Sequence, residues 1–146
     1  MRLTFARYIT LSALTLLLML PQSGLASRPI GGDYCGEAIS GGEWVDVVTT
    51  LTTESNGLLT GTYRFDDRGE ISPGTLREDE KQSEDTRTLV WVDKYGTGKL
   101  TMRFTPSRSS FDGEWGANDE TPIFGWNGAS CNFDSVRNSA DYPAQS

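Results

Sequence analysis

The sequence contains no histidine among its 146 residues. This absence excludes hydrolases that use a histidine base, and it excludes metal sites built on imidazole ligands. Only two cysteines are present, which are too few to hold a metal ion without further soft ligands. No glycine-rich phosphate loop is present either, because the glycines at 96–98 precede a strand pattern and not a helix. The sequence therefore predicts no metal site, no nucleotide and no other cofactor.

Long apolar runs are scarce, and the one that exists lies near the start of the chain, at 11–20. Arg2 and Arg7 precede it, a proline ends it, and small residues follow up to Ala26. This order is typical of a secretory signal peptide, and the run is short for a helix that spans a bilayer. We therefore predict a signal peptide over 1–26 that is cleaved near Ala26, a secreted or periplasmic protein, and no membrane association after cleavage.

Basic residues are outnumbered by acidic ones, 13 against 20, which gives a net charge of −7. Cleavage would remove 26 residues that hold two arginines and no acid, so 120 residues with a charge of −9 would remain. Such a charge repels nucleic acid and anionic lipid, so neither is expected as a partner. A chain of this length forms one domain with a single core, which we place at 27–134. The polar stretch 135–146 lacks periodicity and is predicted to be a disordered tail.

The two cysteines, Cys35 and Cys131, lie near the start and the end of the predicted domain. In an oxidising compartment this pair favours a disulfide bond. The bond would close a loop of nearly the whole domain, which the chain-entropy account values at about 4 kcal/mol.

Short alternating segments separated by turn residues fill the chain from 42 onward. In "KLTMRFT", for example, Leu100, Met102 and Phe104 alternate with polar residues, which predicts a strand with one buried face. The predicted strands are 44–53, 58–66, 73–78, 87–93, 99–105, 110–116, 122–126 and 129–133. Their short connections favour an all-β fold, an antiparallel meander of about seven or eight strands. We predict closure into a small barrel because closure removes exposed edges, with a β-sandwich as the alternative.

Two segments, "LLTGTYRF" and "SSFDGEWG", place a glycine between two large side chains. Gly61 lies between Leu59 and Tyr63, and Gly113 lies in the same way between two aromatic residues. Residues two apart share a face of a strand, so each glycine leaves a gap on that face. The gap is predicted to accept a ring from a neighbouring strand or to let the strand coil sharply, and its aromatic rim is a candidate pocket wall.

The strand motifs "GEWVDVVTT", "NGLLTGTYRF", "LVWVDKY" and "IFGWNG" are similar in order to those of avidin-like barrels, a calycin-type fold. The resemblance implies an eight-stranded barrel with the following residues near the pocket: Trp44, Asp46, Thr50, Tyr63, Trp91 and Trp126. Two positions depart from the family, because Phe65 stands where it offers a small hydroxyl and Phe111 replaces a tryptophan. The polar groups that would satisfy a buried ureido ring are thus incomplete, so the resemblance is carried over to the fold and not to biotin binding.

Three functional hypotheses follow. The first is a secreted or periplasmic non-enzymatic binding protein whose ligand or protein partner is unidentified. Its candidate ligand-binding residues are Trp44, Tyr63, Trp91, Trp115 and Trp126. The second is a carboxylate-dependent hydrolase of the glycoside type, using a pair of acids drawn from Glu43, Asp46, Asp93, Asp112 and Glu114. The third is an acidic inhibitor or interaction protein that presents the loop 78–85 to a basic protein partner.

The hydrolase hypothesis makes a prediction about the strand at 110–116. Asp112 and Glu114 alternate with the aromatic positions there. If the aromatic residues face the core, these two acids face solvent. The hypothesis requires that two of the candidate acids meet in one cleft and that one of them has a raised pKa.

Overall fold

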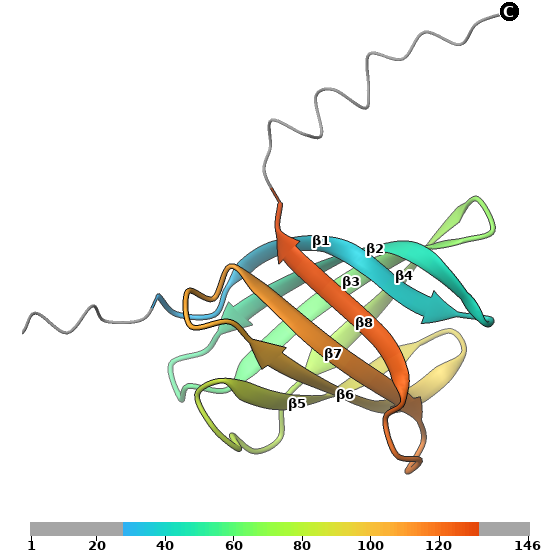
Figure 1. Cartoon of the computed structure of the whole chain (residues 1–146). Helices are drawn as coiled ribbons and strands as arrows, with labels where there is room; N and C mark the ends of the chain where they lie inside the picture. The colour runs from blue at the N-terminus through green and yellow to red at the C-terminus, as the bar shows by residue number, and fades with distance from the viewer. Residues whose placement is uncertain (1–27, 132–146) are drawn as a thin grey trace, which may run out of the picture.

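The computed structural model describes residues 28–131, which form a closed barrel of eight antiparallel strands (Figure 1). The strands are β1 (Gly32–Ser40), β2 (Glu43–Thr53), β3 (Leu59–Asp67), β4 (Glu70–Arg77), β5 (Thr86–Asp93), β6 (Gly96–Phe104), β7 (Ser110–Ala117) and β8 (Phe124–Ser130). Each strand pairs with the next, and β8 returns to pair with β1. The all-β meander and its closure are therefore confirmed, and the sandwich alternative is wrong. The predicted signal peptide (1–26), the predicted tail (135–146) and both ends of the predicted domain (27 and 132–134) lie outside the described residues.

Two errors in the predicted strands cancel in the count. The prediction missed β1, because its glycines and its small or charged residues give only two fully buried positions, Tyr34 and Ala38. It also divided β8 into two strands at its glycine and asparagine residues. Gly128 does not break β8, because it faces the barrel interior, where a Cβ atom would lie 2.8 Å from the ring of Phe111. The described residues contain no helix with the length and apolar character needed to cross a bilayer.

The side chains that occupy the interior come from alternate positions of each strand. In β6 the side chains of Leu100, Met102 and Phe104 are buried, as the sequence pattern predicts. The rings of Tyr34, Phe104 and Phe111 pack against one another with centroids 5.5 to 5.9 Å apart, in tilted or edge-to-face arrangements. The buried side chains form one continuous core inside the barrel. The arrangement is that of small barrels, in which inward and outward residues alternate on every strand.

Gly61 and Gly113 both allow two backbones to approach closely. A Cβ atom at Gly61 would lie 2.1 Å from the carbonyl oxygen of Thr50, and one at Gly113 would lie 2.7 Å from that of Trp126. At these two positions the gap is therefore filled by a neighbouring strand's backbone and not by an aromatic ring. This is the sharp coiling that closure of a small barrel requires.

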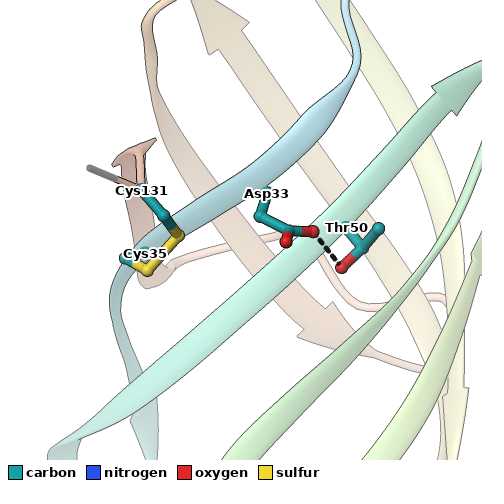
Figure 2. The surroundings of a disulfide bond; sticks show 4 residues. All are labelled: Asp33, Cys35, Thr50 and Cys131. Carbon is teal, nitrogen blue, oxygen red and sulfur yellow. Dashed lines mark hydrogen bonds between the residues drawn. A yellow bond between two sulfur atoms is a disulfide. The ribbon is translucent and has the colours of Figure 1, made fainter. Parts of the chain in front are cut away.

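The predicted disulfide is confirmed: Cys35 in β1 bonds to Cys131, directly after β8, with Cα atoms 5.1 Å apart (Figure 2). It lies beside the pairing of β1 with β8, the seam at which the barrel closes. Figure 2 also shows Thr50 on the adjacent strand, where its Oγ1 donates a hydrogen bond to Asp33 at 2.7 Å. A disulfide of this kind is consistent with an extracellular or periplasmic protein.

One end of the barrel, formed by the loops 54–58, 78–85 and 105–109, is sealed by a buried ion pair. Arg87 donates from Nε to Oε1 of Glu78 at 2.7 Å, and its Nη2 contacts the second carboxylate oxygen. Arg87 also donates to the carbonyl of Gly57, and the backbone N–H of Leu59 donates to Glu78. Both carboxylate oxygens of Glu78, and Nε and Nη2 of Arg87, thus have hydrogen-bond partners. We call this ion pair and its contacts the plug.

Candidate functional site

A cavity of about 770 Å³ opens at the other end of the barrel, where the turns 41–42, 68–69 and 94–95 lie. Its wall comes from strands β1, β2, β3, β5, β7 and β8. The structure places all five predicted ligand-binding residues in this wall: Trp44, Tyr63, Trp91, Trp115 and Trp126. Of the further residues that the avidin-like resemblance implies, Asp46 lines the cavity. Thr50 does not, because its hydroxyl contacts Asp33 between β1 and β2.

Four aromatic residues pack in pairs on the inner wall. Trp91 meets Trp115 edge to face, with ring centroids 5.5 Å apart and an interplanar angle of 89°. Tyr63 meets Trp126 in the same manner at 4.7 Å and 74°. Trp44 differs from these four, because it is 52% exposed and its ring lies over Gly125 of β8. Trp44 is therefore a rim residue, whereas the other four form the inner wall.

Glycines on neighbouring strands set the positions of two of these rings. Tyr63 is the direct cross-strand partner of Gly74, and Trp91 is that of Gly98. A Cβ atom at Gly74 would lie 2.1 Å from the tyrosine ring, and one at Gly98 would lie 2.8 Å from the indole ring. Each ring thus occupies the space that a side chain at the opposite glycine would need. A glycine gap that accepts a ring from a neighbouring strand, as predicted for Gly61 and Gly113, therefore occurs at Gly74 and Gly98 instead.

The indole N–H groups of the inner wall all donate to protein acceptors. Trp91 donates to the carbonyl of Gly116 at 3.0 Å, and Trp115 donates to that of Ile39 at 2.9 Å. Trp126 donates to Oγ1 of the buried Thr49 at 3.1 Å. These bonds fix the orientation of the three rings.

Tyr63 and Asp93 form the polar pair nearest to the aromatic wall. The tyrosine hydroxyl donates to Oδ2 of Asp93 at 2.8 Å, and the backbone N–H of Tyr95 donates to Oδ1 at 2.8 Å. Burial, together with the carboxylate that accepts its proton, raises the pKa of Tyr63 above its ordinary value of 10.0. The phenol is therefore protonated in the folded protein at any pH near neutrality.

This shift predicts a loss of stability in alkaline solution. The folded state holds the Tyr63 proton more tightly than the unfolded chain, so the stabilisation is complete below pH 10 and is lost as the pH rises above that value. Each pH unit in that range should lower the free energy of unfolding by up to about 1.4 kcal/mol for this group. Urea titrations of the wild type and Tyr63→Phe between about pH 9 and about pH 11 measure the difference in slope. Equal slopes would contradict the assignment, since all other titrating groups are shared.

The candidate acids of the hydrolase hypothesis divide into two groups. Glu43, Asp46 and Asp93 line the cavity. Asp112 and Glu114 lie on the outer face of β7, as alternation predicts, and Glu114 contacts Arg103 at 3.4 Å. A pair that joins a cavity acid to an outer acid is therefore excluded.

Sequence reasoning missed part of the rim, namely Asp66, Asp67, Arg68 and Tyr95. Asp67 accepts from Lys94 at 2.7 Å and from the hydroxyl of Tyr95 at 2.5 Å, and these two contacts lower its pKa. A signal was present, because every second turn of a meander lies at the same end of the barrel. The turns after β3 and β5 therefore lie at the same end as the turn 41–42, which directly precedes β2 and its Trp44.

The acidic loop 78–85 lies at the sealed end, and most of its charge is balanced within the chain. Glu78 is buried against Arg87, and three other acids of the loop contact a cation: Asp79 with Arg77, Glu84 with Lys81, and Asp85 with Arg108. The loop therefore presents less free negative charge than its sequence indicates. Among residues 28–131, no group of three or more acids and cysteines is arranged to hold a metal ion.

No protein-family model, no curated protein and no solved structure matches this chain. The closed antiparallel barrel is compatible with a calycin-like fold. A function must therefore be argued from the chemistry of the cavity.

Proposed function

We propose that this protein is an exported binding protein that holds a small organic ligand in the cavity at the open end of its barrel. The observation that carries the proposal is the cavity itself, about 770 Å³ with an aromatic inner wall. This volume lies within the range of small-molecule sites, which are concave, mostly apolar and furnished with a few polar groups. The Cys35–Cys131 bond supports export, because such bonds persist in oxidising compartments.

The distribution of exposed apolar side chains also supports a site at this end. The large hydrophobic residues that the described part of the chain exposes are Trp44, Ile71, Val92, Tyr95, Ile123 and Phe124. All six lie in or beside the turns at the open end. Exposed apolar side chains gathered at the end of the barrel that holds the cavity favour this end as the place of contact with a ligand or partner. No comparable group surrounds the sealed end in residues 28–131.

The resemblance to avidin-like barrels supports the location of the proposed site at the open end, but it does not support the same ligand. Trp44, Asp46 and Tyr63 line the cavity, as that resemblance implies. Phe65, however, lines it where the family offers a hydroxyl, so a ureido carbonyl would lose a donor at this position. Biotin is therefore not the ligand that we propose.

The hydrolase remains a second candidate because three acids line the same cavity. Glycoside hydrolysis needs two carboxyl groups that flank one bond. Asp93 is engaged by Tyr63 and by a backbone N–H, so a catalytic pair would draw on Glu43 and Asp46 as well. The two candidates are separated by the fate of the bound molecule, which is released unchanged or cleaved.

A thermal-shift screen with small amphiphilic molecules tests the proposed function. A ligand at about 100 times its Kd stabilises the folded state by about 2.7 kcal/mol, which should raise the Tm by roughly 10 °C. Ala38→Phe should abolish this response, because Ala38 lies on the cavity wall and an added ring would occupy the space. Thr62→Phe is the matched control, since it adds the same ring on the outer face of β3.

Two outcomes of this comparison decide whether the cavity is the site. Loss of the shift in Ala38→Phe but not in Thr62→Phe supports the cavity as the site. A shift that persists in a folded Ala38→Phe variant overturns the proposal, because the molecule then binds elsewhere. Mass spectrometry of the recovered molecule decides between binding and hydrolysis, and a change in tryptophan fluorescence of the wild type supplies a second readout should Ala38→Phe fail to fold.

A further inference from the structure

We propose that the ligand is an organic cation, an ammonium group joined to an apolar or aromatic body. The inference rests on the proposed function and names the chemical class of its ligand. It follows from three properties of the cavity: the donors of its inner aromatic wall are engaged, four of its five acids lack cationic partners, and its wall presents aromatic rings.

The cavity offers few free donors. The indole N–H groups of Trp91, Trp115 and Trp126 all donate to protein acceptors. Both tyrosine hydroxyls of the lining donate to carboxylates, Tyr63 to Asp93 and Tyr95 to Asp67. An anionic ligand, or one that presents carbonyl groups, would leave its acceptors without partners there, which is costly in a desolvated site.

The cavity offers acceptors with an uncompensated negative charge. Four lining acids have no ion-pair partner among the described residues: Asp93 on the inner wall, and Glu43, Asp46 and Asp66 near the turns, where Glu43 and Asp46 are exposed to solvent. The fifth lining acid, Asp67, is bonded to Lys94. The single cation of the lining, Arg68, has a side chain that is 92% exposed, so it does not balance the wall from within. A cation is therefore the charge type that this cavity attracts.

The aromatic wall suits the same ligand. Ring faces attract an ammonium group through their quadrupole, and this attraction strengthens when water is excluded. The rim already contains one such contact, in which Nζ of Lys94 lies 5.1 Å from the ring centroid of Tyr95. The inner wall repeats the aromatic and acidic combination, with Tyr63 and Trp126 beside Asp93, but contains no cation of its own.

Three probes of nearly equal size and shape test the charge preference by calorimetry at pH 7: 3-phenylpropylammonium, 3-phenylpropan-1-ol and 3-phenylpropionate. We expect the ammonium probe to bind about ten-fold more tightly than the alcohol, and the carboxylate to bind more weakly than both. Asp93→Asn should reduce the preference about five-fold, because it removes the unpaired charge of the inner wall, and Asp46→Asn should reduce it less, because Asp46 is exposed at the rim. Glu80→Gln is the matched control, since it removes one exposed charge at the sealed end.

Each alternative outcome overturns the inference in a distinct way. If the alcohol or the carboxylate binds as tightly as the ammonium probe and Ala38→Phe abolishes it, the cavity is a site but not for a cation, and the proposed function stands. If the ammonium probe binds equally well to Ala38→Phe, or loses as much affinity in Glu80→Gln as in Asp93→Asn, the preference is a property of the whole acidic surface. If no probe binds at about 10 mM, a free energy weaker than about −3 kcal/mol, the inference falls and the screen alone decides the function.

Discussion

Replacing Cys35 and Cys131 together by alanine should lower the free energy of unfolding by about 4 kcal/mol. The two residues are separated by 96 positions, so the bond constrains almost the whole unfolded chain. It also lies at the seam between β1 and β8, where the first and last strands must find each other across the longest span of sequence. Since small domains have a total stability of about 5 to 15 kcal/mol, this loss removes a large part of it.

Urea denaturation of the wild type, the double variant and the reduced wild type measures the effect. Reduction should reproduce the double variant within about 1 kcal/mol, because both remove the same loop constraint. A double variant as stable as the oxidised wild type would contradict the prediction and would mean that strand pairing alone holds the seam. A loss seen in the variant but not on reduction would attribute the effect to the substituted side chains.

Breaking the ion pair at the sealed end should have an effect of similar size. Glu78→Gln leaves Arg87 with a buried charge and no counter-charge, and such a change costs about 3 to 5 kcal/mol. The side chains of Glu78 and Arg87 are 0% and 3% exposed, so water cannot compensate for the missing partner. Arg87→Met should be destabilising for the converse reason, because it leaves the carboxylate with only the N–H of Leu59.

The double variant Glu78→Gln/Arg87→Met shows whether the loss comes from the unpaired charge. It should be more stable than either single variant, since no buried charge remains. Arg77→Met is the control, because its contact with Asp79 is exposed and should contribute less than about 1 kcal/mol. If Glu78→Gln costs no more than this control, the plug is not a buried ion pair in solution and the sealed end is open to water.

The strand pattern was predictable wherever one face of a strand is apolar. In β6 and in the first half of β7 the alternation is regular, so the inward positions of Leu100, Met102 and Phe111 followed from the sequence. Strand β1 lacked this signal because it is held mainly by pairing on both sides, with β2 and β8. Backbone hydrogen bonds to a neighbour do not depend on which side chains the strand carries, so a propensity argument could not detect it.

The candidate site was predictable in its aromatic residues but not in its extent. Trp91, Trp115 and Trp126 were selected because aromatic residues on the inward face of a small barrel line either a core or a pocket. Whether these aromatic residues line a core or a pocket depends on how much of the interior their rings fill. The positions of the rings depend in turn on glycines of adjacent strands, such as Gly74 and Gly98. Their register with the rings is a product of hairpin geometry.

The sequence by itself determined the all-β character, the disulfide partners, the absence of histidine chemistry and the acidic charge. These properties are local or compositional, so they do not depend on how the chain closes. Only the tertiary structure decided which end of the barrel is sealed and which holds the cavity. It also decided that the inner indole groups are satisfied by protein acceptors, two of them 76 and 77 positions distant in sequence. Contacts of this range exist only once β8 has joined β1, and the free acceptors and occupied donors of the cavity follow from that closure.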